Sequence, residues 1–246
     1  MLKGFLVITN IHGRYRELVS ILGRVKKELE SYQLIFLGDY IGCGPEPSRT
    51  LELIKTLQKY YDAVVIKGDY EDLFYQSVKG NDKEIRSAAS RQLIKLGGKH
   101  TIDDLWKEKQ KTFSYLKFIE KMENYYEEDN YFFSHSGINP SRYISGMTAN
   151  ELGKLQTQED LLNNPLFFKS YMKQCTKLPF KFVFGHIPNQ ILNKYIYNTL
   201  DKCKIFEYQN LIGTDFGAAH FNHGYLGVTA IMLDEHTFTL TEKLIC

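Results

Sequence analysis

Short apolar runs alternate with amphipathic stretches along the first third of the chain. Residues 2–9 form an almost continuous apolar run, which predicts a buried strand. Apolar side chains then recur at helical spacing over residues 18–29, and a second strand is predicted at residues 34–37. Ser48 is the predicted cap of the next helix, and a third strand follows at residues 63–66. This order of elements is typical of βαβ units with a largely parallel sheet.

The pattern changes in the middle of the chain and changes back near its end. Residues 83–128 are polar and helical in pattern, with a break at Gly97 and Gly98, and they predict a helical excursion. Strand-like runs then resume and predict a second, more antiparallel sheet, at residues 131–133, 182–184, 228–233 and 238–240. No linker rich in Ser, Pro or Gly and no internal repeat divides the chain, so we expect residues 1–246 to form one domain.

Composition and charge narrow the classes of partner. The chain has 246 residues, 43% of them hydrophobic, which is enough for a sizeable core. Its 31 basic and 29 acidic residues leave a net charge of +2, so no bulk electrostatic field favours nucleic acid or an anionic membrane. No apolar run approaches the length of a membrane span. The four cysteines are widely spaced and form no Cys-x-x-Cys pair, which favours a reduced, cytoplasmic location.

The candidate chemistry lies directly after the predicted strands. A His, Asp or Asn stands beside a glycine in each of five segments: Asn10-Ile11-His12-Gly13, Gly38-Asp39, Gly68-Asp69, Ser134-His135-Ser136-Gly137 and Gly185-His186. Any one of them is also what an ordinary turn would contain. Together they predict a shared site, because the carboxyl ends of strands in an open α/β sheet line the crevice where ligands bind. Their histidines and aspartates would suit Mn, Fe or Zn, and Mg less well.

These segments resemble the motifs of the calcineurin-like metallophosphoesterases, which run D-x-H, G-D, G-N-H-E, H-A/S-G and G-H in the same order. The similarity covers most of the chain. Residues 125–140, the Gly97-Gly98 pair followed by Thr101, and the segment Val183-Phe184-Gly185-His186 resemble the branch that contains serine/threonine phosphatases, phage-type phosphatases and symmetrical dinucleoside tetraphosphatases. Residues 38–45, with their glycine-proline turn, instead resemble a phosphodiesterase-type branch.

The resemblance implies a fold, a site and a reaction. The fold would be α/β, with a central two-sheet β-sandwich flanked by helices in four layers. The site would hold two divalent metal ions, one bound by Asn10, His12 and Asp39, the other by Asp39, Asp69, His135 and His186. A metal-bound hydroxide would then attack the phosphorus of a phosphomonoester or nucleoside polyphosphate. The expected substrates are phosphorylated small molecules, nucleotides or phosphoproteins.

Two departures from the family motifs fall on the metal ligands. Asn10 stands where the family has Asp, and Asp69 stands where it has Asn. The number of carboxylates is unchanged, but a neutral amide oxygen is a weaker ligand than a carboxylate. We therefore expect the site that contains Asn10 to be the weaker of the two.

Further departures fall on groups that would act on the substrate. Tyr70 replaces the family histidine that protonates the leaving group, and together with Asp39 it is a predicted catalytic residue. A phenol with an ordinary pKa of about 10 is a poor acid at neutral pH, so we expect reduced or altered activity. Gly42-Cys43 replaces an Asp-Arg pair, which removes a phosphate-binding arginine. Arg14 and Lys169 are the predicted phosphate-binding cations.

A catalytically weak pseudo-phosphatase that acts as a binding or regulatory module is the alternative. Asn10, Tyr70 and Cys43 favour this alternative. Retention of Asp39 and of the family's strand-end histidines favours the enzyme, because buried imidazoles without partners are costly. The sequence contains no P-loop, no nucleophile elbow and no dinucleotide-binding fingerprint. We therefore predict a hydrolase of the phosphatase class.

Overall fold

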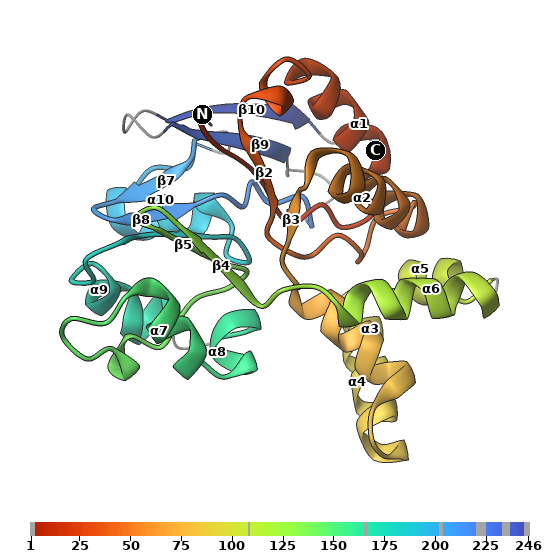
Figure 1. Ribbon diagram of the computed structural model, residues 1–246. Helices are drawn as coiled ribbons and strands as arrows, with labels where there is room; N and C mark the ends of the chain where they lie inside the picture. The colour runs from red at the N-terminus through yellow and green to blue at the C-terminus, as the bar shows by residue number, and fades with distance from the viewer. Residues whose placement is uncertain are drawn as a thin grey trace.

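Two five-stranded sheets lie at the centre of the structure and carry helices on their outer sides (Figure 1). The computed structural model describes residues 3–107, 109–164, 167–201, 204–219, 225–232 and 237–243. The first sheet contains, in spatial order, β10 (Thr237–Lys243), β9 (Tyr225–Met232), β1 (Gly4–Ile8), β2 (Gln33–Phe36) and β3 (Val64–Val65). The second contains β4 (Tyr125–Glu128), β5 (Tyr131–Ser134), β6 (Lys181–Phe184), β8 (Leu211–Gly213) and β7 (Phe206–Tyr208).

Both sheets combine parallel and antiparallel pairs. In the first sheet β1, β2 and β3 are parallel, and β9 and β10 continue the sheet in antiparallel fashion. In the second sheet β5, β6 and β8 are parallel, and β4 and β7 are antiparallel strands at the two edges. Parallel neighbours end at the same edge of a sheet. The chain therefore leaves β1, β2, β3, β5 and β6 at carboxyl ends that can build one site.

The prediction that the last two strands belong to the second sheet is wrong. β9 pairs with β1, in a register that sets Gly4 opposite Met232, and β10 pairs with β9. Periodicity indicates that a segment is a strand, but it does not indicate which sheet edge that segment covers. Strands β4, β7 and β8, of three or four residues each, are not among the predicted strands.

Helices cover the outer face of each sheet (Figure 1). Over the first sheet lie α1 (Tyr15–Arg24) and α2 (Pro47–Tyr61), and over the second lie α7 (Ala149–Leu155), α8 (Gln158–Leu162), α9 (Met172–Cys175) and α10 (Asn189–Tyr197). Short 3₁₀ turns occur at Glu28–Glu30 and Pro140–Arg142, and a π-helical turn occurs at Phe167–Tyr171. Among the described residues, no helix is both long enough and apolar enough to cross a membrane.

The first residue of α2 differs from the prediction. Ser48 does not cap this helix, because the helix already begins at Pro47 and Glu46 is its N-cap residue. Proline has a fixed φ and no N–H to satisfy, so it suits the first helical position. The backbone N–H of Ser48 instead donates to Oδ2 of Asp104, at 3.0 Å.

A helical arm projects from the side of the sandwich and consists of α3 (Asp69–Lys79), α4 (Lys83–Lys95), α5 (Lys99–Leu105) and α6 (Lys109–Glu120) (Figure 1). The helical conformation is interrupted between α4 and α5 at Gly97 and Gly98, where the sequence predicts a break. The helical stretch ends earlier than the predicted residue 128, because Tyr125–Glu128 form β4. All four residues of this edge strand are half-buried. A strand with one buried face alternates apolar and polar residues, and this strand has no such alternation.

The hydrophobic core lies in three layers that the strands separate. Phe5 and Val7 of β1 lie between the sheets, together with Phe133 and Val183 of the second sheet. The alternate positions of β1 face the helices outside the first sheet, and a third cluster packs under the helices outside the second. This is the strand alternation expected of a sandwich with covered faces. Largely buried strands therefore hold the loops at their carboxyl ends.

Candidate metal centre

Side chains from five strand ends meet at one edge of the sandwich. Asn10 and His12 follow β1, Asp39 follows β2, Asp69 opens α3 after β3, His135 follows β5 and His186 follows β6. The two sheets thus contribute to the same site, as the strand-end motifs predict. The role of each residue stays a prediction, but its place in the fold is clear.

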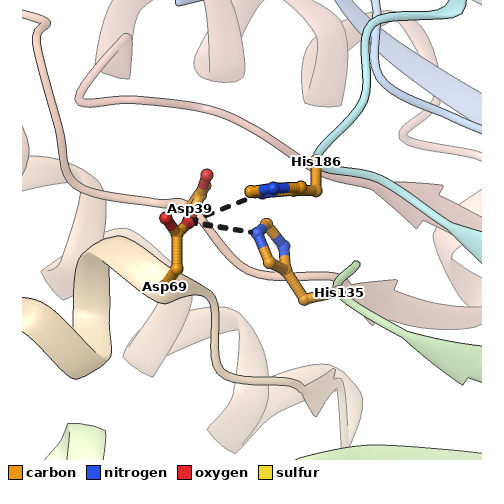
Figure 2. A group of neighbouring side chains, drawn as sticks. All are labelled: Asp39, Asp69, His135 and His186. Atoms are coloured by element: carbon orange, nitrogen blue, oxygen red, sulfur yellow. Dashed lines mark ion pairs between the residues drawn. The ribbon is translucent and has the colours of Figure 1, made fainter. Parts of the chain in front are cut away.

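Four of these residues form the tightest cluster, which we call the four-ligand group: Asp39, Asp69, His135 and His186. One ligand atom from each lies within 4.8 Å of all the others. Nε2 of His135 is 3.4 Å from Oδ1 of Asp39 and 3.3 Å from Oδ1 of Asp69, and Nδ1 of His186 is 3.7 Å from Oδ1 of Asp69. Figure 2 shows both imidazoles pointing toward the two carboxylates.

The hydrogen bonding of His135 fixes which ring nitrogen faces the group. Nδ1 lies 2.6 Å from the carbonyl oxygen of Leu37, which can only accept, so Nδ1 carries the proton and donates. In the neutral ring the lone pair of Nε2 therefore points at the two aspartates. Nε2 of His135 and Oδ1 of Asp69 are both buried and make no hydrogen bond to the described residues. Two such acceptors side by side fit a cation between them.

The ionisation of each residue in the four-ligand group depends on the charges of the others. Burial opposes ionisation of Asp69, but the adjacent imidazoles of His135 and His186 hold its pKa well below the usual range. Burial, reinforced by the charge of Asp69, raises the pKa of Asp39. Burial lowers the pKa of His135, but Asp39 and Asp69 outweigh it and raise that pKa well above the ordinary value. Nε2 of His135 therefore binds a proton when no other cation is present, and a metal ion would take the place of that proton. Two buried carboxylates thus compete for positive charge, which a divalent ion would supply.

Asn10, His12 and Oδ2 of Asp39 form a second cluster beside the four-ligand group, which we call the Asn10 corner. Nδ2 of Asn10 is 3.5 Å from Nε2 of His12 and 3.5 Å from Oδ2 of Asp39. Burial is the main reason why the pKa of His12 falls to about 3, so this imidazole is neutral at pH 7. Oδ1 of Asp39 faces the four-ligand group, and Oδ2 of the same carboxylate faces the Asn10 corner.

The backbone at the site is held in an uncommon conformation. Asn10, His12, Asp39 and His186 all have positive φ, between 50° and 62°. Such a left-handed backbone is unfavourable for residues with a Cβ atom, although Asn, Asp and His tolerate it better than most. It persists only where the surrounding structure enforces it, and such residues cluster at functional sites.

Glu71 enforces part of this geometry, a role that is not among the predictions from the sequence. Its carboxylate accepts hydrogen bonds from the backbone N–H groups of Asp39, Tyr40, Ile41 and Gly68, at 2.8 to 3.0 Å. Glu71 is fully buried and joins the loop after β2 to the start of α3. A glutamate three residues after a helix-capping position is the pattern of a capping box, so Gly68 and Glu71 carry a signal that predicts at least the last of these bonds.

Tyr70 lies beside the site, but its hydroxyl is engaged elsewhere. The hydroxyl donates to the carbonyl oxygen of Leu96 at 2.7 Å, while the ring packs edge-on against His12 with centroids 4.9 Å apart. Burial and the charge of Asp39 raise the pKa of this phenol above its ordinary value. Both observations make Tyr70 a poor proton donor at neutral pH.

The loop that follows Tyr40 closes over His12. The N–H of Gly42 donates to Oγ1 of Thr101 in α5, and the same hydroxyl donates back to the Gly42 carbonyl, both at 2.9 Å. A Cβ atom at Gly42 would lie 2.6 Å from Nδ1 of His12, so this backbone leaves no room for the carboxylate that the family pattern has there. The thiol of Cys43 next to it is buried, and burial raises its pKa.

Of the two predicted phosphate-binding cations, the structure describes the side chain of Arg14 but not that of Lys169. Arg14 is buried, with 4% of its surface exposed. Burial lowers the pKa of His12 and raises that of Cys43, and the charge of Arg14 adds to the first effect and opposes the second. Arg14 thus follows His12 of the Asn10 corner by two residues and interacts with it electrostatically, and its guanidinium is a group that could bind a phosphate. The side chain of Lys169 lies outside the described residues, and only its backbone is placed, in the π-helical turn.

Comparison with known proteins identifies the family. A family model described as calcineurin-like phosphoesterase matches residues 4–220. The chain belongs to this family. A search of the curated proteins gives no match. The family that the strand-end motifs predict is confirmed, and so is the α/β fold of two sheets flanked by helices. The chain is therefore a phosphoesterase, a hydrolase, as predicted.

Solved structures share the fold of this phosphoesterase at low sequence identity. One is a protein assigned as a diadenosine tetraphosphatase, with a TM-score of 0.59 and 15% identity, covering 96% of this chain and 92% of that one. Another is a serine/threonine phosphatase from Saccharomyces cerevisiae with similarity to human phosphatase PP5, with a TM-score of 0.59 and 13% identity, covering 98% and 80%. A third is the hypothetical protein PH1004 from Pyrococcus horikoshii OT3, with a TM-score of 0.56 and 14% identity, covering 96% and 86%.

Proposed function

We propose that this phosphoesterase hydrolyses a phosphomonoester or a nucleoside polyphosphate with a divalent metal ion bound in the four-ligand group. The observation that carries this proposal is the pair of buried acceptors, Nε2 of His135 and Oδ1 of Asp69, which lie 3.3 Å apart without a hydrogen bond to the described residues. Nitrogen and carboxylate ligands together suit Mn, Fe or Zn better than Mg. A bound ion of this kind polarises a phosphoryl oxygen and lowers the pKa of a bound water.

The other residues of the site would position the phosphate. Arg14, buried beside His12, can donate charge-assisted hydrogen bonds to phosphate oxygens. Lys169 is a second predicted cation, and the cytoplasmic location also stays a prediction. Phosphorylated small molecules, nucleotides and phosphoproteins are the proposed substrates. The names of two proteins with this fold, a diadenosine tetraphosphatase and a serine/threonine phosphatase, support this range.

The test is turnover of an aryl phosphate by protein loaded with Mn, compared with the same protein after treatment with a chelator. We expect the chelator to abolish turnover and added Mn to restore it. The reaction would need the ion to polarise the phosphoryl group and to activate the attacking water. Metal analysis of the same samples should show loss and recovery of the ion. Turnover that survives complete removal of metal would contradict the proposal.

The pseudo-phosphatase is the second candidate, because Asn10 and Tyr70 both weaken groups that catalysis would use. The amide of Asn10 replaces a charged ligand, and the hydroxyl of Tyr70 is bonded to Leu96. A protein that binds metal in the test above but turns over neither aryl nor alkyl phosphates would support this candidate.

Because the hydroxyl of Tyr70 is hydrogen-bonded to Leu96, we expect the rate of turnover to depend strongly on the leaving group. Aryl phosphates leave as stabilised anions, whereas phosphoserine leaves as a strong base that needs a proton. We expect turnover of an aryl phosphate to exceed that of a phosphoserine peptide by on the order of 10²-fold or more, since a general acid contributes that much. Replacement of Tyr70 by histidine should narrow the ratio. Equal rates in the unmodified protein would show that another group supplies the proton.

A further inference from the structure

The Asn10 corner differs from the four-ligand group in what it offers a cation. We propose that this chain holds a single metal ion, bound by the four-ligand group, and that the Asn10 amide closes the corner where a second ion would bind. The inference deepens the proposed function and rests on it, because it concerns the number of ions at the same site.

The orientation of the Asn10 amide is fixed by its neighbours. Oδ1 of Asn10 accepts from the backbone N–H of His186 at 3.0 Å and from the hydroxyl of Thr9 at 2.7 Å. A backbone N–H can only donate, so a flipped amide would set two donors face to face. Oδ1 also packs closely against Gly185, where an added Cβ atom would lie 2.7 Å from it. Nδ2 is therefore the atom that faces the corner.

The three atoms of the corner are spaced as in a metal site, but one of them is the amide nitrogen of Asn10, which cannot bind a metal ion. Nδ2 of Asn10, Nε2 of His12 and Oδ2 of Asp39 form a triangle with sides of 3.5, 3.5 and 3.8 Å. A point about 2.1 Å from all three atoms exists at its centre, which is a usual metal-to-ligand distance. An amide NH₂ group carries two protons and offers no lone pair. Those protons point at His12 and Asp39 instead and occupy the space of an ion.

The four-ligand group has no such obstacle. Each of its members presents a carboxylate oxygen or an imidazole nitrogen, and the atoms lie within 4.8 Å of one another. Asp69 and His135 are buried and direct acceptor atoms into the group that make no hydrogen bond to the described residues. An aspartate at position 10 would remove the obstacle from the corner. One of its oxygens would accept from His186, and the other would replace Nδ2.

Manganese alone, added to the metal-free full chain, tests the inference through metal analysis and electron paramagnetic resonance. We expect one Mn per chain, with the hyperfine spectrum of an isolated ion. In Asn10→Asp we expect Mn content to double and the spectrum to show two coupled ions. Asn163→Asp, which adds the same charge at an exposed position, should keep one ion. His12→Gln should also keep one ion, since His12 lies outside the four-ligand group, and this variant serves if Asn10→Asp fails to fold.

Each other outcome overturns a definite statement. Two coupled ions in the unmodified chain would overturn the single-ion inference and leave the proposed function intact. One ion in a folded Asn10→Asp variant would show that the amide is not what closes the corner. Loss of the ion in a folded His12→Gln variant would place the single ion in the Asn10 corner. No bound Mn in the unmodified chain would overturn both the inference and the metal-dependent function.

Discussion

Replacement of Asp69 by alanine is expected to lower turnover of an aryl phosphate by on the order of 10³-fold or more. Oδ1 of Asp69 is the one carboxylate oxygen in the described structure that lies within 4.0 Å of both His135 and His186. Its loss leaves Asp39 as the only carboxylate of the four-ligand group. A bound ion contributes several kcal/mol to stabilising charge in the transition state, and each 1.36 kcal/mol or so is a tenfold change in rate. Metal analysis should show a parallel loss of bound ion.

Asp72 provides a matched control on the same helix. It is half-exposed and accepts a hydrogen bond from Gln158 at 2.6 Å, away from the four-ligand group. Asp72→Ala removes the same charge and the same atoms, and we expect it to change turnover and metal content little. Unaltered metal binding in a folded Asp69→Ala variant would contradict the assignment of Asp69 as a ligand.

Replacement of Glu71 by glutamine is expected to lower the free energy of unfolding by about 2 to 5 kcal/mol, the cost of leaving two buried N–H donors unsatisfied. Each carboxylate oxygen of Glu71 accepts from two backbone N–H groups. Either orientation of a glutamine amide would therefore turn its NH₂ group toward two donors. Urea denaturation, followed by circular dichroism on metal-free protein, measures the change without a contribution from bound ions.

Glu84→Gln is the control, because Glu84 is exposed in the first turn of α4. We expect its effect to stay within about 0.5 kcal/mol, as for most surface substitutions. A similarly small effect for Glu71→Gln would mean that the loop after β2 keeps its conformation without the carboxylate. The expected result would establish Glu71 as the residue that holds Asp39 in its left-handed backbone conformation.

The sequence by itself determined which residues meet at the site. Each chemical motif directly follows an apolar run, as in the Gly38-Asp39 and Gly185-His186 segments. The position and the end of a strand depend on the local order of apolar residues and glycines, so the sequence pattern predicts both. Convergence then follows from a general rule, because the carboxyl ends of parallel strands share an edge. For the same reason the family could be predicted from motif order alone.

Sheet membership and side-chain orientation were decided only by the tertiary structure. β9 lies against β1, more than 200 residues earlier in the chain, and no local pattern encodes that pairing. The sequence predicts Asn10 as a weak ligand, but the N–H of His186, 176 residues away, turns its amide oxygen from the corner. Likewise the carbonyl of Leu96 engages the Tyr70 hydroxyl. A hydrogen bond depends on distances of a few ångströms between atoms from distant segments, and only the folded chain sets those distances.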